Sequence, residues 1–158
     1  MEFECTKRFK KEYKELKSDN SKIFEDLKKD LFDLSLDQLF NHYQNLGKGH
    51  HSVRLKKHRV RNRSKNQSAS GGFRIYFQIN KETQIIRLMT IYCKVGKRKH
   101  AKIALNENEE KQLKDELKFH NQNPSRNYKN VSHLSEVVCT TSVSHLASKV
   151  AKNSETYL

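Results

Sequence analysis

The chain is poor in the residues that build disulfide frameworks, rigid turns and membrane spans. Its 158 residues include three cysteines, one proline, five glycines and no tryptophan. The cysteines are odd in number, far apart and without a Cys-x-x-Cys spacing, which argues against a disulfide or zinc framework. No apolar run approaches the ~18 residues that a membrane span needs, and basic residues interrupt any secretory signal. We therefore expect a cytoplasmic protein that uses neither a metal nor another cofactor.

Hydrophobic residues are also scarce. They make up 34% of the chain and the mean hydropathy is −0.95, so we expect a small core and a highly charged surface. The length suffices for one domain with a core plus an extension. After Pro124 the composition shifts towards Ser, Asn, Thr and Val. We place the domain at residues 1–119 and a partly helical or flexible extension at residues 120–158.

Acidic residues are nearly absent from the middle third of the sequence. Between Lys48 and Lys102 there are 16 Lys and Arg residues and a single acid, Glu82, whereas the rest of the chain is close to neutral. A merely solvated surface would intersperse both signs, so this segregation favours a polyanionic partner. Nucleic acid is favoured over a membrane because the basic segment has the pattern of strands, not of an amphipathic helix.

The strongest local signal is Gly71 to Asn80, where two glycines precede strict alternation. Phe73, Ile75, Phe77 and Ile79 share one face of the predicted strand, and Arg74 begins the other. Flanking strands are predicted at Val53–Val60 and Gln84–Val95, the latter apolar on both faces as an inner strand would be. The polar, basic stretch from Arg61 to Ser70 is predicted to be a loop.

Helical spacing marks both ends of the domain. After a short strand at Phe3–Cys5, helices are predicted from Lys7 to Lys17, from Ile23 to Leu34, and onwards from a capping box at Ser35 and Gln38. A second capping box, Asn106 with Glu109, opens a helix that ends before Pro124. We predict an α+β fold in which an N-terminal helical hairpin packs on one face of a small twisted antiparallel sheet, with a C-terminal helix. The other face of the sheet is expected to contact RNA.

Several segments in this order resemble the RelE/HigB-like toxins of bacterial toxin–antitoxin systems. The segments are Phe9 to Leu16, the Gly71-Gly72-Phe73-Arg74 strand, Ile91-Tyr92-Cys93-Lys94, and Leu105 with Glu109 at the last helix. The resemblance covers about residues 1–119. It implies a RelE-like fold and a ribonuclease that cleaves messenger RNA, usually on the ribosome, until a cognate antitoxin protein inhibits it.

The resemblance also implies site residues. Arg74 is expected to contact the scissile phosphate, and Arg98 of Val95-Gly96-Lys97-Arg98 is expected to assist it. Basic side chains on the preceding strand correspond to Arg54, Lys56 and His58, which share a face. The full set has Arg74, Arg98, Lys94 and His58 as catalytic residues, and Arg54, Lys56, Lys57, Tyr76, Lys97 and Lys99 as RNA-binding residues.

The chemistry of metal-independent RNA cleavage constrains these roles. The 2′-hydroxyl must lose a proton, the phosphorane must be stabilised, and the leaving 5′-oxygen must be protonated. Guanidinium suits the phosphorane, and histidine needs little tuning to act as a base, which favours His58 over His100. Lysine can act as a base if burial or neighbouring cations lower its pKa. Some members of the family have a catalytic tyrosine where this chain has Ala104, so another group must supply the base here.

Two other functions remain open from the sequence. The first is a ParE-like toxin that poisons DNA gyrase and cleaves nothing, for which the basic face would be dispensable. The second is a non-catalytic RNA-binding module, which the missing tyrosine favours.

Overall fold

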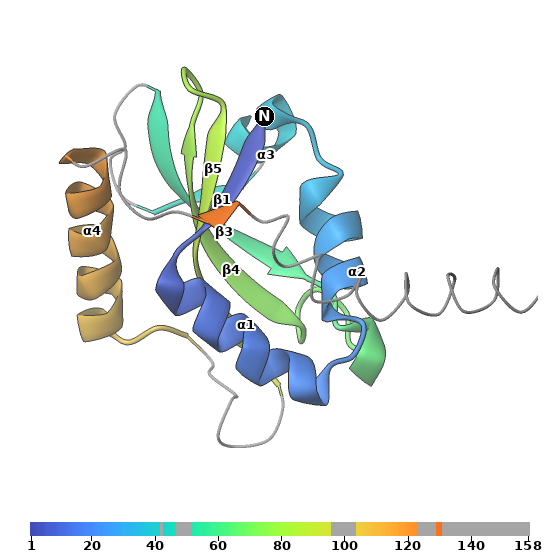
Figure 1. Ribbon diagram of the computed structural model, residues 1–158. Coiled ribbons are helices and arrows are strands. Elements are labelled where there is room, and N and C mark those ends of the chain that lie inside the picture. Colours follow the sequence, from blue (N-terminus) through green and yellow to red (C-terminus); the bar gives the residue numbers. More distant parts are fainter. Residues whose placement is uncertain (42, 47–51, 96–103, 123–128, 131–158) are drawn as a thin grey trace, which may run out of the picture.

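The protein folds as an α+β unit around a mixed sheet, described here from a computed structural model (Figure 1). The structure describes residues 1–41, 43–46, 52–95, 104–122 and 129–130. The strands lie in the order β2-β3-β4-β5-β1-β6. Their bounds are β1 Glu2–Cys5, β2 Gln44–Asn45, β3 Val53–Val60, β4 Phe73–Asn80, β5 Ile85–Cys93 and β6 Lys129–Asn130. The predicted central strand is therefore confirmed as β4, paired with β3 on one side and β5 on the other.

The prediction of a wholly antiparallel sheet is wrong for one pair of strands. β1 runs parallel to β5, with Glu2 opposite Ile85 and Cys5 opposite Leu88. The β3–β4 and β4–β5 pairs are antiparallel and are joined by the segments predicted as loop and turn. The short connection from Asn80 to Ile85 fixes the antiparallel direction of β4 and β5. β1 and β5 are far apart in sequence, so no turn constrains their relative direction.

The helices before β3 cover one face of the sheet. α1 spans Lys7–Asp19, and Thr6 caps it by accepting a hydrogen bond from the Phe9 amide at 3.2 Å. The predicted second helix is divided into α2, Ile23–Leu27, and a π-helical turn η1, Lys28–Phe32. α3 spans only Leu36–Asn41, with the Ser35–Gln38 capping box in place, and the chain then enters β2. The predicted helical part before the sheet thus consists of α1, α2 and α3, with a π-helical turn between α2 and α3.

The larger core lies between these helices and the sheet. The alternating residues of β4 lie in it, since Phe73, Ile75, Phe77 and Ile79 are all fully buried against α1, α2 and η1. A bulge in β5 inserts Met89 opposite the junction of Tyr76 and Phe77. The Glu12 carboxylate accepts hydrogen bonds from the Thr90 hydroxyl at 2.6 Å and the Ile91 amide at 2.9 Å. The bulge is thereby anchored to α1.

The opposite face of the sheet is partly covered by the C-terminal helix. Helix α4, Glu107–Gln122, stands on that side, across the sheet from α1 and α2 (Figure 1). Its capping box is confirmed, with the Glu109 amide donating to Asn106 Oδ1 at 2.9 Å. A second apolar cluster forms beneath it, made of Leu55, Tyr76, Met89, Tyr92, Leu105 and Leu113. An apolar stripe on a helix must be buried against some surface, and here that surface is the middle of this face.

The sheet continues beyond the expected domain end at residue 119. α4 runs to Gln122, and β6 pairs with β1 through Glu4 opposite Asn130. None of the helices in the described part of the chain is both long and apolar enough to cross a membrane.

Candidate nucleic-acid interface

Four cations gather at one end of the α4 side of the sheet. Antiparallel pairing places Arg59 of β3 directly opposite Arg74 of β4, and residues paired in this way project to the same face. Lys57 lies two residues before Arg59 and pairs with Tyr76, so it projects to that face too. Lys94, just after β5, lies close enough for its charge to act on Lys57. We call Lys57, Arg59, Arg74 and Lys94 the basic cluster.

Like charges directly opposite each other on neighbouring strands destabilise a sheet. Arg59 is exposed, whereas Arg74 is only 4% exposed. Burial and the nearby charge of Arg59 both lower the pKa of Arg74, although a guanidinium stays charged at any physiological pH. The arrangement therefore concentrates positive potential at one place, and a bound anion would relieve the repulsion.

Arg74 also holds the loop that precedes its strand. Its Nη1 donates to the carbonyl oxygens of Ala69 at 2.9 Å and Phe73 at 3.2 Å, and its Nη2 donates to that of Ser70. These three hydrogen bonds order the loop, and the charge of the buried guanidinium adds to the positive potential of the basic cluster. This second role was not visible in the sequence.

Lys57 has a lowered pKa in the basic cluster. Burial lowers the pKa of its ammonium group first, and the charges of Arg74, Arg59 and Lys94 lower it further. Its Nζ lies 5.5 Å from the centre of the Tyr76 ring. One acid opposes the shift, because the carboxylate of Glu110 in the first turns of α4 raises the pKa of Lys57. Lys57 thus meets the condition that a lysine base requires, namely crowding by other cations.

Three predicted site residues lie on the wrong face. Arg54, Lys56 and His58 do share one face, but β3 pairs them with Ile79, Phe77 and Ile75 of the helix-side core. Successive side chains on a strand project to opposite faces, so a shift of one residue moves a whole set across the sheet. For the same reason Lys56 and Lys57 cannot both surround Arg74. The prediction that His58 and Lys56 act beside Arg74 is wrong.

On the helix side these residues have structural partners. The Lys56 ammonium is nearly fully buried and donates to the Tyr43 carbonyl oxygen at 3.0 Å. Burial and the charge of Arg54 lower its pKa. Arg54 stacks over the Phe40 ring, with its guanidinium carbon 4.1 Å from the ring centre. The contacts of Arg54 and Lys56 secure α3 and the segment that follows it to β3.

His58 is buried against the π-helical turn. Its Nε2 lies 2.6 Å from the Asp30 carbonyl oxygen, so Nε2 carries the proton, and its ring meets that of Tyr43 edge-on at 4.1 Å between centres. Burial lowers the pKa of His58, and the nearby Asp30 opposes that change only in part. His58 is therefore held neutral by the fold.

We predict that this histidine makes folding pH-dependent. The pKa of His58 is lower in the folded protein than its ordinary value of 6.5, so above that pH the free energy of unfolding does not depend on this residue's protonation. Below that pH the unfolded chain binds a proton more readily than the folded protein. The free energy of unfolding therefore falls, by at most about 1.4 kcal/mol per pH unit. The free energy of unfolding, measured with urea between pH 7.5 and pH 5.5, should fall more steeply for the wild type than for His58→Gln. Gln retains an N–H donor for Asp30 but does not titrate, so equal slopes would contradict the prediction.

The predicted RNA-binding role of Tyr76 is also corrected. Tyr76 is fully buried and Tyr92 is 5% exposed, and their rings stack on each other at 6.2 Å beneath α4. Burial is the first cause that raises the pKa of Tyr76, and its contact with Tyr92 adds to it. An RNA base cannot reach either ring in this arrangement.

The other predicted residues fall into two groups. Arg74 and Lys94 are brought together with Lys57, as expected. Arg98, Lys97 and Lys99 lie outside the described residues, as does His100. Sequence reasoning missed Arg59 and Glu110. Arg59 could have been found from its spacing of two residues from Lys57, whereas Glu110 depends on where α4 packs.

Within the described ranges, no group of three His, Cys, Asp or Glu side chains could hold a metal ion. No protein-family model matches the chain, and no curated protein matches it in sequence.

Proposed function

We propose that this chain is a toxin-type endoribonuclease with a RelE-like arrangement, cleaving messenger RNA at the basic cluster without a metal ion. The observation that carries the proposal is the pairing of Arg59 with Arg74 on neighbouring strands, with the charges of Lys57 and Lys94 close by. Such a concentration of cations suits a phosphodiester and its more negative transition state. The family resemblance of residues 1–119 supports the choice of RNA, the ribosome as the setting, and an antitoxin as partner.

The proposed chemistry assigns one step to each group. Lys57, once deprotonated, takes the proton from the 2′-hydroxyl, and the resulting oxygen attacks phosphorus. Arg59, which is exposed, stabilises the phosphorane through charge and donated hydrogen bonds, and the buried Arg74 adds its charge. The ammonium of Lys94 gives its proton to the leaving 5′-oxygen, which breaks the P–O bond and leaves a 2′,3′-cyclic phosphate. No tyrosine at position 104 is needed in this scheme.

The deciding experiment incubates the purified full-length protein with ribosomes and messenger RNA, and separately with gyrase and DNA. Cleaved RNA with cyclic phosphate ends is the expected result. Gyrase-linked DNA breaks without RNA cleavage would replace the proposal with the ParE-like function.

A non-catalytic RNA-binding module is the second candidate, favoured by the engagement of Arg74 with loop carbonyls. Binding of RNA without cleavage, on and off the ribosome, would establish it.

We predict that RNA binding depends steeply on salt through the basic cluster. Each phosphate contact releases counterions, so the slope of log affinity against log salt should shrink by about 0.7 when one contact is removed from a single-stranded site. Arg59→Ala should show this smaller slope in fluorescence anisotropy with a short RNA. Lys14→Ala, an exposed lysine on α1, is the matched control and should keep the wild-type slope. Identical slopes for the two variants would place the RNA elsewhere.

A further inference from the structure

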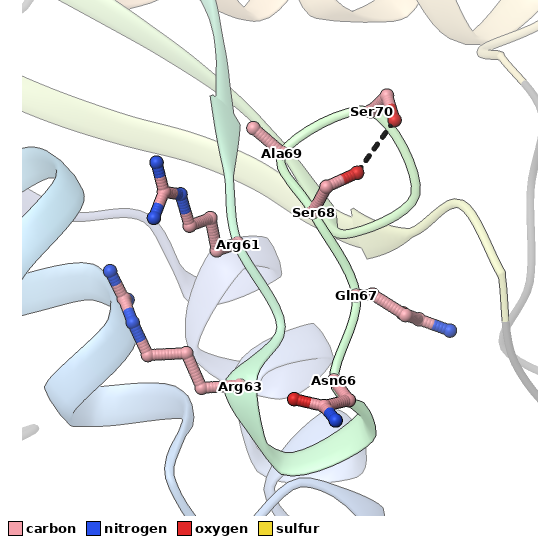
Figure 2. Close-up of a pocket in the computed structure, with 7 residues that line it drawn as sticks. All are labelled: Arg61, Arg63, Asn66, Gln67, Ser68, Ala69 and Ser70. Atoms are coloured by element: carbon pink, nitrogen blue, oxygen red, sulfur yellow. Dashed lines mark hydrogen bonds between the residues drawn. The ribbon is translucent and has the colours of Figure 1, made fainter.

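The loop between β3 and β4 connects the helix side of the protein to the basic cluster. It contains a short helical turn, η2, Arg63–Lys65. Figure 2 shows the two limbs of this loop, with Arg63 on the first limb and Ala69 and Ser70 on the second. Arg74 donates hydrogen bonds to the carbonyl oxygens of Ala69 and Ser70. The place of the loop therefore determines where the Arg74 guanidinium lies.

Arg63 anchors the first limb to the helices. Its Nη1 lies 2.9 Å from Asp26 Oδ1, and its Nη2 lies 2.9 Å from Asp30 Oδ1. The Arg63 amide also donates to Asp26 Oδ2 at 3.0 Å, and the Arg61 amide donates to Asp30 Oδ2 at 2.9 Å. Burial would raise the pKa of Asp30, but these hydrogen bonds lower it overall. Asp26 is fully buried, so separating it from Arg63 would leave an unpaired buried charge, which is costly.

Asn62 links the two limbs to each other and to α1. Its amide donates to the Gln67 carbonyl oxygen at 3.1 Å, and its own carbonyl oxygen accepts from the Gln67 amide at 2.8 Å. The buried Asn62 side chain donates to Asn20 Oδ1 at 2.7 Å, at the end of α1. Next along the second limb, the Ser68 carbonyl oxygen accepts from the Gly72 amide at 2.9 Å. Hydrogen bonds therefore run without a break from the helices into the limb that holds Arg74.

Arg74 depends on a fixed support because it lies opposite Arg59. Like charges at paired positions of two strands repel each other, so a side chain that is free to move would turn away. The carbonyl oxygens of Ala69 and Ser70 carry partial negative charge, and their hydrogen bonds with Arg74 offset this repulsion. They can do so only while the loop keeps them in place. The anchored loop therefore sustains the positive potential of the basic cluster.

We propose that Arg63 is a positioning residue, which fixes the loop through its ion pairs with Asp26 and Asp30 and so holds Arg74 beside Arg59. The two aspartates balance the charge of Arg63, so it contacts no phosphate and acts only through Arg74. This role rests on the proposed function only in taking RNA as the substrate, since the loop holds Arg74 whether or not the chain cleaves.

The test is a double-mutant cycle with Arg63→Lys and Arg74→Met, measured as single-turnover cleavage of ribosome-bound messenger RNA by the full-length protein. Arg63→Lys keeps the charge, but an ammonium lacks the planar fork that bonds both carboxylates. It should lower the cleavage rate about tenfold in the wild type and less than about twofold in the Arg74→Met background. Lys65→Arg changes an exposed lysine of the same turn and should leave the rate unchanged. Equal losses in the two backgrounds would overturn the role of Arg63.

A second variant, Asp30→Asn, separates a lost contact from a folding defect. The Asp30 side chain is 18% exposed and Arg63 retains its ion pair with Asp26, so this variant leaves no unpaired buried charge. Asn keeps one acceptor oxygen in place of two, so either the Arg63 guanidinium or the Arg61 amide loses its bond. With an intact circular dichroism spectrum, Asp30→Asn should lower cleavage in the same Arg74-dependent way. A full wild-type rate in both folded variants would contradict the proposal.

NMR of the Arg74 side chain tests the positioning without RNA. In the wild type, the hydrogen bonds to Ala69 and Ser70 should hold the guanidinium still, so that its Nη protons give separate signals, assigned by their loss in Arg74→Met. In Arg63→Lys and Asp30→Asn these signals should merge as the group rotates. Merged signals in the variants of a protein that cleaves no RNA would uphold the positioning and refute the endoribonuclease. Signals that stay separate in folded variants of a protein that does cleave would do the reverse.

Discussion

Replacing Lys57 by Met should lower the rate of RNA cleavage by about 10²- to 10⁴-fold, the range for removal of a general base. The expectation rests on its place beside Arg59, Arg74 and Lys94 and on its lowered pKa, which makes the neutral amine accessible. The rate for the wild type should rise with pH and level off below the ordinary lysine value of 10.5. The rising limb should be absent in Lys57→Met. The measurement is the single-turnover cleavage rate on ribosome-bound messenger RNA as a function of pH.

Two further variants separate the base from a simple positive charge. Lys57→Arg keeps the charge but cannot give up its proton, so it should cleave as poorly as Lys57→Met. Lys81→Met removes a lysine from the turn after β4 whose side chain is 50% exposed, and it should cleave at the wild-type rate. A Lys57→Arg protein with near-normal activity would assign Lys57 an electrostatic role and leave the base unidentified.

Local features of the fold could be predicted from the sequence because their causes are local. The capping boxes at Ser35 and Asn106 each need only residues three positions apart, and both are present. The alternation from Phe73 to Ile79 likewise determines which side chains of β4 enter the core. Elements of this kind were predicted with their type correct and their ends within a few residues.

Features that depend on two distant segments could not be predicted in this way. The face of His58 depends on the register of β3 against β4, which no property of β3 alone determines. The burial of Tyr76 depends on α4. The leucines of α4 indicate that one side of this helix is buried, but they do not identify the surface that buries it. The parallel pairing of β1 with β5 is a third case. Sequence reasoning therefore brought Arg74, Lys94 and Lys57 together, but it placed Arg54, Lys56 and His58 on the wrong face of the sheet.

The second glycine of the pair before Arg74 lies close against the end of β3. A Cβ atom at Gly72 would lie 2.2 Å from the Val60 carbonyl oxygen and 2.9 Å from the Asn62 amide nitrogen. These are backbone atoms at the end of β3 and the start of the loop, so no side-chain rotation can relieve the overlap. A Cβ atom at Gly71 would have ordinary contacts, the nearest at 3.8 Å to Gln67 Cβ.

Gly72→Ala should therefore lower the free energy of unfolding by about 3 kcal/mol, at the upper end for overpacking in a site that cannot yield. Gly71→Ala should change it by less than about 1 kcal/mol, because reduced freedom of the unfolded chain offsets small adjustments. Urea denaturation of both variants beside the wild type measures the difference. Since Gly72 directly precedes the strand that holds Arg74 and lies against the end of β3, its substitution should also separate Arg59 from Arg74 and abolish RNA cleavage. Two variants of equal stability would mean that β3 and the glycine pair do not approach each other this closely, and the pairing of the two arginines would lose its support.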